Sequence, residues 1–256
     1  MKFIQYHNSL DEQGIEACCI AAYSARKNGN LPNCSFVFYH TKSEEVKNIP
    51  IVKVAFDEVL PLPEKALKTL NSLPNYVNWI HKSNRHLSCW SKFLCWLFTD
   101  GDCILTDYDV LCLGSIREAI PKSPNIISGF KAGGKQPVFI GSVLGKNASF
   151  DYSGARDVML TALLNQDIYI YTQKKWNWID EAAVWYYFHC YGMGNALCLE
   201  RKFNMGLWWL DRHPKDFKDI RLLHFVSNYK PWNNVEGCEK YNKLWYDTRD
   251  ELLRKC

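Results

Sequence analysis

Stretches rich in β-branched and aromatic residues alternate with amphipathic helical patterns over residues 1–100 of the chain. This alternation restricts the fold, because a strand, a helix and a second strand in succession form a βαβ unit with parallel strands. Two strand-like runs within 125–144 follow each other directly and predict an antiparallel addition. We therefore expect an α/β fold with a mixed, mostly parallel central sheet flanked by helices.

The positions of the expected elements follow from the local patterns. The expected strands are Phe3–Tyr6, Ser35–Tyr39, Ile51–Ala55, Cys103–Thr106, Asn125–Phe130, Val138–Leu144 and Leu222–Val226. The expected helices are Glu12–Ala25, Leu87–Thr99, Ser153–Leu164, Glu181–Tyr191 and Glu239–Leu253. The second helix carries one apolar stripe at i, i+3, i+4 and i+7, made by Trp90, Phe93, Leu94 and Leu97.

The composition excludes several classes of protein. Hydrophobic residues make up 47% of the chain and charged residues 23%, which excludes a disordered protein. The formal net charge is only +4 and the basic residues are dispersed, so we expect no nucleic acid partner. No window reaches the roughly 18 uninterrupted apolar residues of a transmembrane helix, so we expect no membrane span.

The 11 cysteines indicate a reducing compartment. None forms a C-x-x-C pair, and most lie in apolar runs, where a free cysteine behaves as a small hydrophobic residue. The first residues lack the apolar run of a signal peptide. We therefore expect reduced thiols in the core and a cytoplasmic protein.

An apolar strand that ends in two carboxylates is the sharpest functional signal. Asp107 and Asp109 follow the run 103–106, and their spacing places both side chains on one side of an extended backbone. Two like charges this close need a cation, a shared proton or full solvation. A divalent ion carrying a phosphate meets that need, and oxygen ligands suit Mg²⁺ or Mn²⁺. In open α/β sheets, ligands bind beyond the carboxyl ends of the strands, where this pair falls.

Two enzyme classes place such a pair after an apolar strand, and a solvated, Asp-rich turn is a third interpretation. In a haloacid-dehalogenase-like phosphatase, Asp107 would be the nucleophile and Asp109 the general acid, and the pair would end the first strand of the domain. In a nucleotide-sugar glycosyltransferase, the pair holds the metal that carries the diphosphate. The late position of the pair and its continuation as Val110-Leu111 favour the glycosyltransferase.

Four segments, in order and at compatible separations, resemble glycosyltransferase family 8, the glycogenin-like enzymes. Residues 91–99 resemble the family's K-x-x-x-W-x-x-T helix, which precedes the D-x-D strand at 107–109. Residues 178–183 are similar to the D-Q or D-E segment that opens a helix beside the sugar site. Residues 223–233 resemble the family's H-F-x-G-x-x-K-P-W motif. The resemblance covers the region between residues 91 and 233.

The resemblance implies a GT-A fold with a Rossmann-like nucleotide-binding half, and a single catalytic domain over 1–256. Residues 1–111 would form the nucleotide-sugar-binding half, and residues 112–256 the acceptor-side half with a closing C-terminal helix. It also implies retaining transfer of a hexosyl group from a nucleoside diphosphate sugar, commonly UDP-linked. The acceptor is open among glycans, proteins and small molecules.

The resemblance also implies roles for individual residues. The metal ligands would be Asp107, Asp109 and His224, and a nitrogen ligand beside two carboxylates favours Mn²⁺, with Mg²⁺ as the alternative. Lys230 would contact the diphosphate and Asp180 would lie beside the transferred sugar, so these two are the expected catalytic residues. The donor contacts would be made by Lys92, Tyr108 and Trp232 together with the Asp pair and Lys230.

The chain departs from the family at three places. The family's Asn-Ser-Gly strand is replaced by Phe139-Ile140-Gly141-Ser142-Val143, and His7-Asn8-Ser9 does not match the usual base-binding sequence. Ser227 stands where a glycine is usual, which changes how closely the backbone approaches a phosphate. A carbohydrate-binding protein that kept the fold and lost turnover is a third functional hypothesis, beside the transferase and the phosphatase. The presence of Asp107, Asp109, His224 and Lys230 together argues against such a loss.

Overall fold

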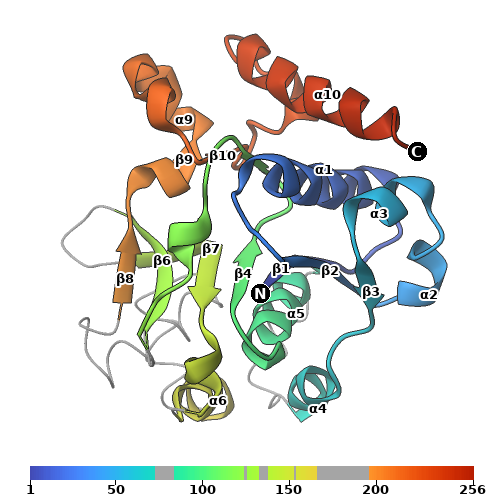
Figure 1. The fold of residues 1–256 in the computed structure, drawn as a ribbon, viewed down its shortest axis with the longest axis vertical. Helices are drawn as coiled ribbons and strands as arrows, with labels where there is room; N and C mark the ends of the chain where they lie inside the picture. The colour runs from blue at the N-terminus through green and yellow to red at the C-terminus, as the bar shows by residue number, and fades with distance from the viewer. Residues whose placement is uncertain (73–83, 124–125, 133–137, 153, 166–195) are drawn as a thin grey trace. The chain divides into compact units, whose positions relative to one another are not determined.

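The computed structural model describes residues 1–72, 84–123, 126–132, 138–152, 154–165 and 196–256 (Figure 1). The chain forms two compact units. The first contains residues 1–60, 106–118 and 199–256, and the second contains residues 61–105 and 119–198. Among the described residues, none of the helices has the length and apolar character needed to cross a membrane.

The central sheet is mixed, as the sequence predicts. Within the described residues it contains seven strands, in the order β3-β2-β1-β4-β7-β6-β8. The strands are β1 (Lys2–His7), β2 (Ser35–His40), β3 (Glu58–Leu60), β4 (Cys103–Thr106), β6 (Ile127–Ala132), β7 (Val138–Lys146) and β8 (Ala196–Leu199). The β1–β2 and β2–β3 pairs are parallel, whereas β6 and β7 pair antiparallel. The α/β class and the antiparallel addition are therefore confirmed.

In the first unit, β1 and β2 run in parallel register, so that their last residues, His7 and His40, lie opposite each other. Helix α1 (Glu12–Asn28) begins at an N-cap, Asp11, whose side chain accepts a hydrogen bond from the backbone N–H of Gly14 at 2.6 Å. Its middle is buried on nearly every side, because α1 contacts β1, β5, α3 and α10. Small residues on α1 allow that close packing.

The first unit also holds a small second sheet with the strand order β5-β10-β9. It is built from β5 (Val110–Cys112), β9 (Met205–Gly206) and β10 (Leu222–His224). Strand β10 pairs antiparallel with β5 and parallel with β9. Residues on either side of position 110 and residues after position 220 are therefore neighbours in space.

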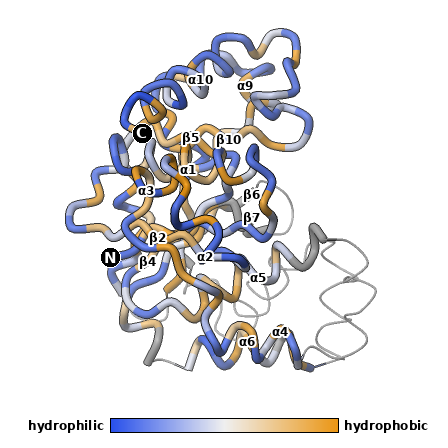
Figure 2. The backbone as a smooth tube through the Cα atoms, turned by 90° about the vertical axis from the view of Figure 1, so that its right-hand side faces the viewer, coloured by the Kyte–Doolittle hydropathy of each residue, from blue (hydrophilic) through white to orange (hydrophobic). Residues whose placement is uncertain are grey.

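Helix α10 (Glu239–Leu253) is the last element of the chain and packs against α1, and it has the bounds that the sequence predicts. Figure 2 shows it as mainly hydrophilic, and its buried face includes Tyr241, Trp245 and Leu252. Ion pairs reinforce this packing: Arg249 contacts Glu16 and Lys27 reaches Glu251 at 2.6 Å. These pairs are partly exposed, so apolar burial stabilises the contact more than the charges do.

The second unit contains α4 (Glu64–Ser72), α5 (Asn84–Phe98), α6 (Ala155–Leu164) and the strands β4, β6, β7 and β8. The predicted apolar stripe of α5 is fully buried at all four positions. Lys146 is also fully buried, and its Nζ donates to the backbone oxygen of Thr99 at 2.6 Å, just beyond the end of α5. A cation there is favourable, because the carbonyl end of a helix is the negative end of its dipole.

One predicted strand is wrong. Residues 51–55 belong to helix α3 (Pro50–Ala55), and the strand of that region is β3, which begins at Glu58. Pro50 occupies the first turn of the helix, where proline is favourable, and this local effect outweighs the β-branched residues that follow. Strand β10 ends at His224, earlier than predicted, and the expected helix Glu181–Tyr191 lies outside the described residues.

The other elements among the described residues are short. They are α2 (Ser43–Val46) and α9 (Leu207–Arg212), with 3₁₀ turns at Arg117–Ala119, Ala148–Tyr152, Arg201–Phe203, Pro214–Asp219 and Pro231–Asn233.

Most of the described cysteines are buried free thiols, in agreement with a core-filling role. Burial raises the pKa of Cys18, Cys19 and Cys95 well above the usual range, and raises the pKa of Cys112 to about 12. Only the thiolate reacts rapidly, so these four thiols are protected both by burial and by protonation. Cys198 and Cys256 are exposed.

We expect a thiol reagent at pH 8 to label Cys198 and Cys256 quickly in the folded protein, and Cys18, Cys19, Cys95 and Cys112 only after unfolding. Peptide mass spectrometry of samples quenched with and without urea measures both groups. Rapid labelling of Cys95 in the native protein would contradict the described packing of α5.

Candidate active site

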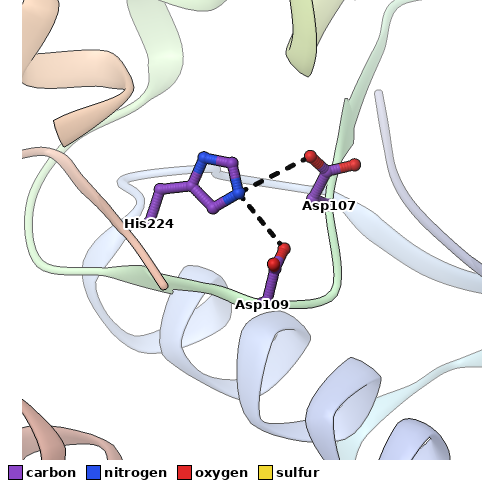
Figure 3. A group of neighbouring side chains, drawn as sticks. All are labelled: Asp107, Asp109 and His224. Carbon is purple, nitrogen blue, oxygen red and sulfur yellow. Dashed lines mark ion pairs between the residues drawn. The ribbon is translucent and has the colours of Figure 1, made fainter. Parts of the chain in front are cut away.

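The Asp pair lies in the first unit, in the short link between β4 and β5. The ladder of β5 and β10 sets His224 opposite Val110, and the backbone N–H of Phe225 donates to the backbone oxygen of Asp109 at 2.9 Å. These contacts bring His224 beside two carboxylates that precede it by more than a hundred residues. Figure 3 shows the imidazole directed toward both carboxylates.

The three side chains form a compact donor set. His224 Nε2 lies 3.4 Å from Asp109 Oδ1 and 3.8 Å from Asp107 Oδ2. One ligand atom from each residue lies within 4.8 Å of the others. Asp109 and His224 are buried, whereas Asp107 is half-buried and open to a ligand. Two carboxylates and one imidazole fit a divalent cation such as Mn²⁺, and the open side leaves coordination positions for a substrate.

Lys230 adds a positive charge on the other side of Asp109. Its Nζ contacts Asp109 Oδ2 and lies 5.6 Å from the centre of the Tyr108 ring. The side chain is mostly buried, with 18% of its surface exposed. A lysine held at the edge of a carboxylate pair is a point charge that can also bind phosphate oxygens.

A buried glutamine supports the backbone of the Asp pair. The side-chain amide of Gln5, on β1, donates to Thr106 Oγ1 at 2.6 Å and to the backbone oxygen of Asp107 at 3.4 Å. Gln5 is fully buried, so this contact is shielded from water. A hydrogen bond formed away from water fixes the direction in which the chain leaves β4.

A polar cluster follows the end of β1. His7 Nε2 lies 2.7 Å from Asp11 Oδ2, and Ser9 Oγ donates to the same carboxylate. Partial burial would raise the pKa of Asp11, but hydrogen bonds from Ser9, His7 and the N–H of Gly14 hold that pKa below its usual value. The His7 ring meets the Tyr108 ring edge-on at 5.9 Å, so this cluster lies beside the D-x-D segment.

His40, at the end of β2, closes the cluster. Its Nε2–H donates to the backbone oxygen of Ser9 at 2.9 Å, and its Nδ1 accepts from the N–H of Lys42 at 3.0 Å. Burial lowers the pKa of His40. This ring is therefore neutral at physiological pH, and its two hydrogen bonds connect the segment after β1 with the segment after β2.

The structure brings together five of the predicted site residues, which are Asp107, Tyr108, Asp109, His224 and Lys230. Trp232 is on the following 3₁₀ turn, where it lines a cavity of about 300 Å³ with Trp245 and residues of α1 and α10. Lys92 lies half-buried on α5, in the second unit. Asp180 lies outside the described residues.

Asn204 is a further residue of this site that the sequence analysis did not single out. Its Oδ1 lies 2.8 Å from Nδ1 of His224, and both side chains are buried. The residues are twenty positions apart, and no spacing rule links them. Only the pairing of β9 with β10 shows that they are neighbours.

Ser227 adopts the backbone conformation that explains the usual glycine. Its φ is +55°, in the left-handed region, where a side chain is unfavourable by about 1–2 kcal/mol. The serine in the turn after β10 therefore bears backbone strain. Asn234, at φ +48°, is a residue type that tolerates this region better.

We expect Ser227→Gly to raise the free energy of unfolding by about 0.5 kcal/mol, because relief of left-handed strain exceeds the added freedom of the unfolded chain. Urea unfolding measures it, with Asn234→Gly as the matched control that gains less. A loss of stability in Ser227→Gly would mean that the serine side chain makes a contact the fold needs.

The fold matches solved glycosyltransferases. The galactosyltransferase LgtC, solved in complex with donor and acceptor sugar analogs, aligns with a TM-score of 0.67 and 12% identity over 98% of this chain and 96% of its own. GlyE of Streptococcus pneumoniae aligns with a TM-score of 0.59 and 11% identity over 99% of this chain and 63% of its own. Mouse xyloside xylosyltransferase 1 gives 0.56 and 13% identity over 90% of this chain and 99% of its own.

No protein-family model and no curated protein sequence matches the chain. At 11–13% identity, the structural likeness establishes the fold alone. The expected GT-A type of fold is therefore confirmed.

Proposed function

We propose that this protein is a metal-dependent, retaining glycosyltransferase related to glycosyltransferase family 8. It would move a hexosyl group from a nucleoside diphosphate sugar, a UDP-sugar, to a glycan, protein or small-molecule acceptor. The observation that carries the proposal is the convergence of Asp107, Asp109, His224 and Lys230 in a chain with a glycosyltransferase fold. Its buried thiols support the prediction of a reducing, cytoplasmic environment.

The donor set supports Mn²⁺ as the metal, with Mg²⁺ as the alternative. Asp107, Asp109 and His224 would hold the ion through two oxygens and one nitrogen, a mixture that suits manganese better than magnesium. When bound, the ion would neutralise the negative charge that develops on the departing diphosphate. Half-buried Asp107 would face the donor, while buried Asp109 and His224 would form the rigid side of the site.

Lys230 would supply a second positive charge for the diphosphate. Its ammonium is next to Asp109 and near the Tyr108 ring, so it would lie at the edge of the metal site. Charge that is already in place where a transition state becomes negative lowers the barrier without further reorganisation. Tyr108, Lys92 and Trp232 are proposed donor contacts.

Retention of configuration is compatible with two routes. Asp180 would either attack the anomeric carbon or accept a hydrogen bond from a hydroxyl of the sugar while stabilising its positive charge. In a front-face route, the departing phosphate itself takes the proton of the acceptor hydroxyl. We favour the front-face route, in which Lys230 and the metal that Asp107, Asp109 and His224 would hold stabilise the leaving group.

The surroundings of Asp109 make the phosphatase hypothesis less favourable. That mechanism needs Asp109 to carry a proton as a general acid. Here the Lys230 ammonium touches the Asp109 carboxylate, and this contact favours the ionised form. A phosphatase would also form an acyl phosphate on Asp107, which mass spectrometry can detect.

We expect Mn²⁺ together with a UDP-sugar to raise the melting temperature and to give metal-dependent hydrolysis or transfer. Asp109→Ala should lower this activity by about 100-fold or more, because it removes a metal ligand. Asp247→Ala, which removes an exposed carboxylate on α10, is the matched control and should keep wild-type activity. Full activity of Asp109→Ala would disprove the metal assignment, and binding without turnover in any acceptor screen would favour the carbohydrate-binding hypothesis.

Lys230→Ala should lower kcat by about 100-fold while leaving Mn²⁺ binding intact, because the lysine serves the diphosphate and not the metal. Lys230→Arg, which keeps the charge, should recover part of the rate. Steady-state kinetics and a separate Mn²⁺ titration make the comparison. A parallel loss of Mn²⁺ binding in Lys230→Ala would instead assign the lysine to the integrity of the metal site.

A further inference from the structure

The hydrogen bond between His224 and Asn204 determines which nitrogen of the imidazole is available. Nδ1 of His224 lies 2.8 Å from Oδ1 of Asn204. An amide oxygen accepts hydrogen bonds and cannot donate them, so Nδ1 must carry a proton. In the neutral ring, Nε2 then has the lone pair, and Nε2 is the atom that faces Asp107 and Asp109.

The bond is buried and its two partners are held by adjacent strands. Asn204 is 7% exposed and His224 is 6% exposed, so water does not compete for Nδ1. Strand β9 begins directly after Asn204, and its ladder pairs Met205 with Leu223 and Gly206 with His224. The backbone N–H of Asn204 donates to the oxygen of Arg201 at 2.9 Å.

The backbone of Asn204 is therefore held by contacts that do not involve its side chain. The side chain makes a separate hydrogen bond to His224. We propose that Asn204 is a positioning residue that holds His224 in the Nδ1–H tautomer and directs Nε2 to the metal. This inference rests on the metal site of the proposed function. Histidines that bind metals commonly donate their second nitrogen to such a partner, whose loss weakens metal binding by about 10–100-fold.

Loss of this bond would affect both the stability of the protein and its metal binding, and a single variant would not distinguish the two effects. Any loss of the bond leaves a buried polar group unpaired and lowers stability. Only a positioning role also changes metal affinity and the tautomer of His224. Asn204→Leu has a similar shape and removes the acceptor, whereas Asn204→Asp keeps an acceptor oxygen. Asn242→Leu, at another buried asparagine of the first unit on α10, is the matched control.

The experiment titrates Mn²⁺ alone into each folded variant, with free Mn²⁺ followed by electron paramagnetic resonance. We expect the Kd to rise by about 10–100-fold in Asn204→Leu, and to stay within about threefold of wild type in Asn204→Asp and Asn242→Leu. Two-bond ¹H–¹⁵N spectra of His224 should show the Nδ1–H tautomer in wild type and a shift toward Nε2–H in Asn204→Leu.

The outcomes distinguish this inference from the proposed function. If wild type binds Mn²⁺ and folded Asn204→Leu binds it equally well with an unchanged tautomer, the positioning role is wrong and the metal site stands. If wild type binds no Mn²⁺, both the metal site and the role of Asn204 are overturned. If Asn204→Leu fails to fold, Asn204→Ser, with a shorter side chain that cannot span the distance to Nδ1, replaces it and must show the same rise in Kd.

Discussion

The pairing of β10 with β5 is the interaction on which the candidate site depends. Without it, Asp107 and Asp109 are two repelling charges at the end of a buried strand. The antiparallel ladder sets His224 opposite Val110, and the turn that follows β10 carries Lys230 to Asp109. In the same compact unit, the two carboxylates thus lie beside a histidine that could bind a metal cation with them and beside a lysine that is itself a cation.

Around this pair of strands, buried amides give the site its rigidity. Gln5 on β1 holds the hydroxyl of Thr106 and the backbone oxygen of Asp107, and Asn204 beside β9 holds the ring of His224. Each amide is buried, so its hydrogen bonds do not exchange with water and specify one arrangement of the groups they contact. Asp107 is half-buried, whereas Asp109 and His224 are buried, so Asp107 is the most accessible of the three.

The prediction of the fold succeeded for the long helical patterns and for the strands β1, β2 and β4, and it failed at residues 51–55 and at the shortest strands. Helix α10 has the predicted bounds, and the four apolar residues of the α5 stripe are all buried. A stripe that repeats over several turns can be buried in only one orientation of the helix. The run 51–55 is too short for such a pattern, and Pro50 decided its conformation. Strands β5 and β9, of three and two residues, carry no periodicity that a sequence can show.

By itself, the sequence determined the chemical groups: two carboxylates after an apolar strand, a histidine and lysine in a distant motif, and a serine where a glycine is usual. The carboxylates followed from their spacing of two residues, and the histidine, lysine and serine followed from the resemblance of residues 223–233 to a known motif. The tertiary structure alone decided that Asn204 meets His224, that Gln5 meets Thr106 across 101 positions, and that Ser227 takes a left-handed backbone. The first two are consequences of strand pairing, which hydrogen bonds between distant segments set and no local pattern encodes.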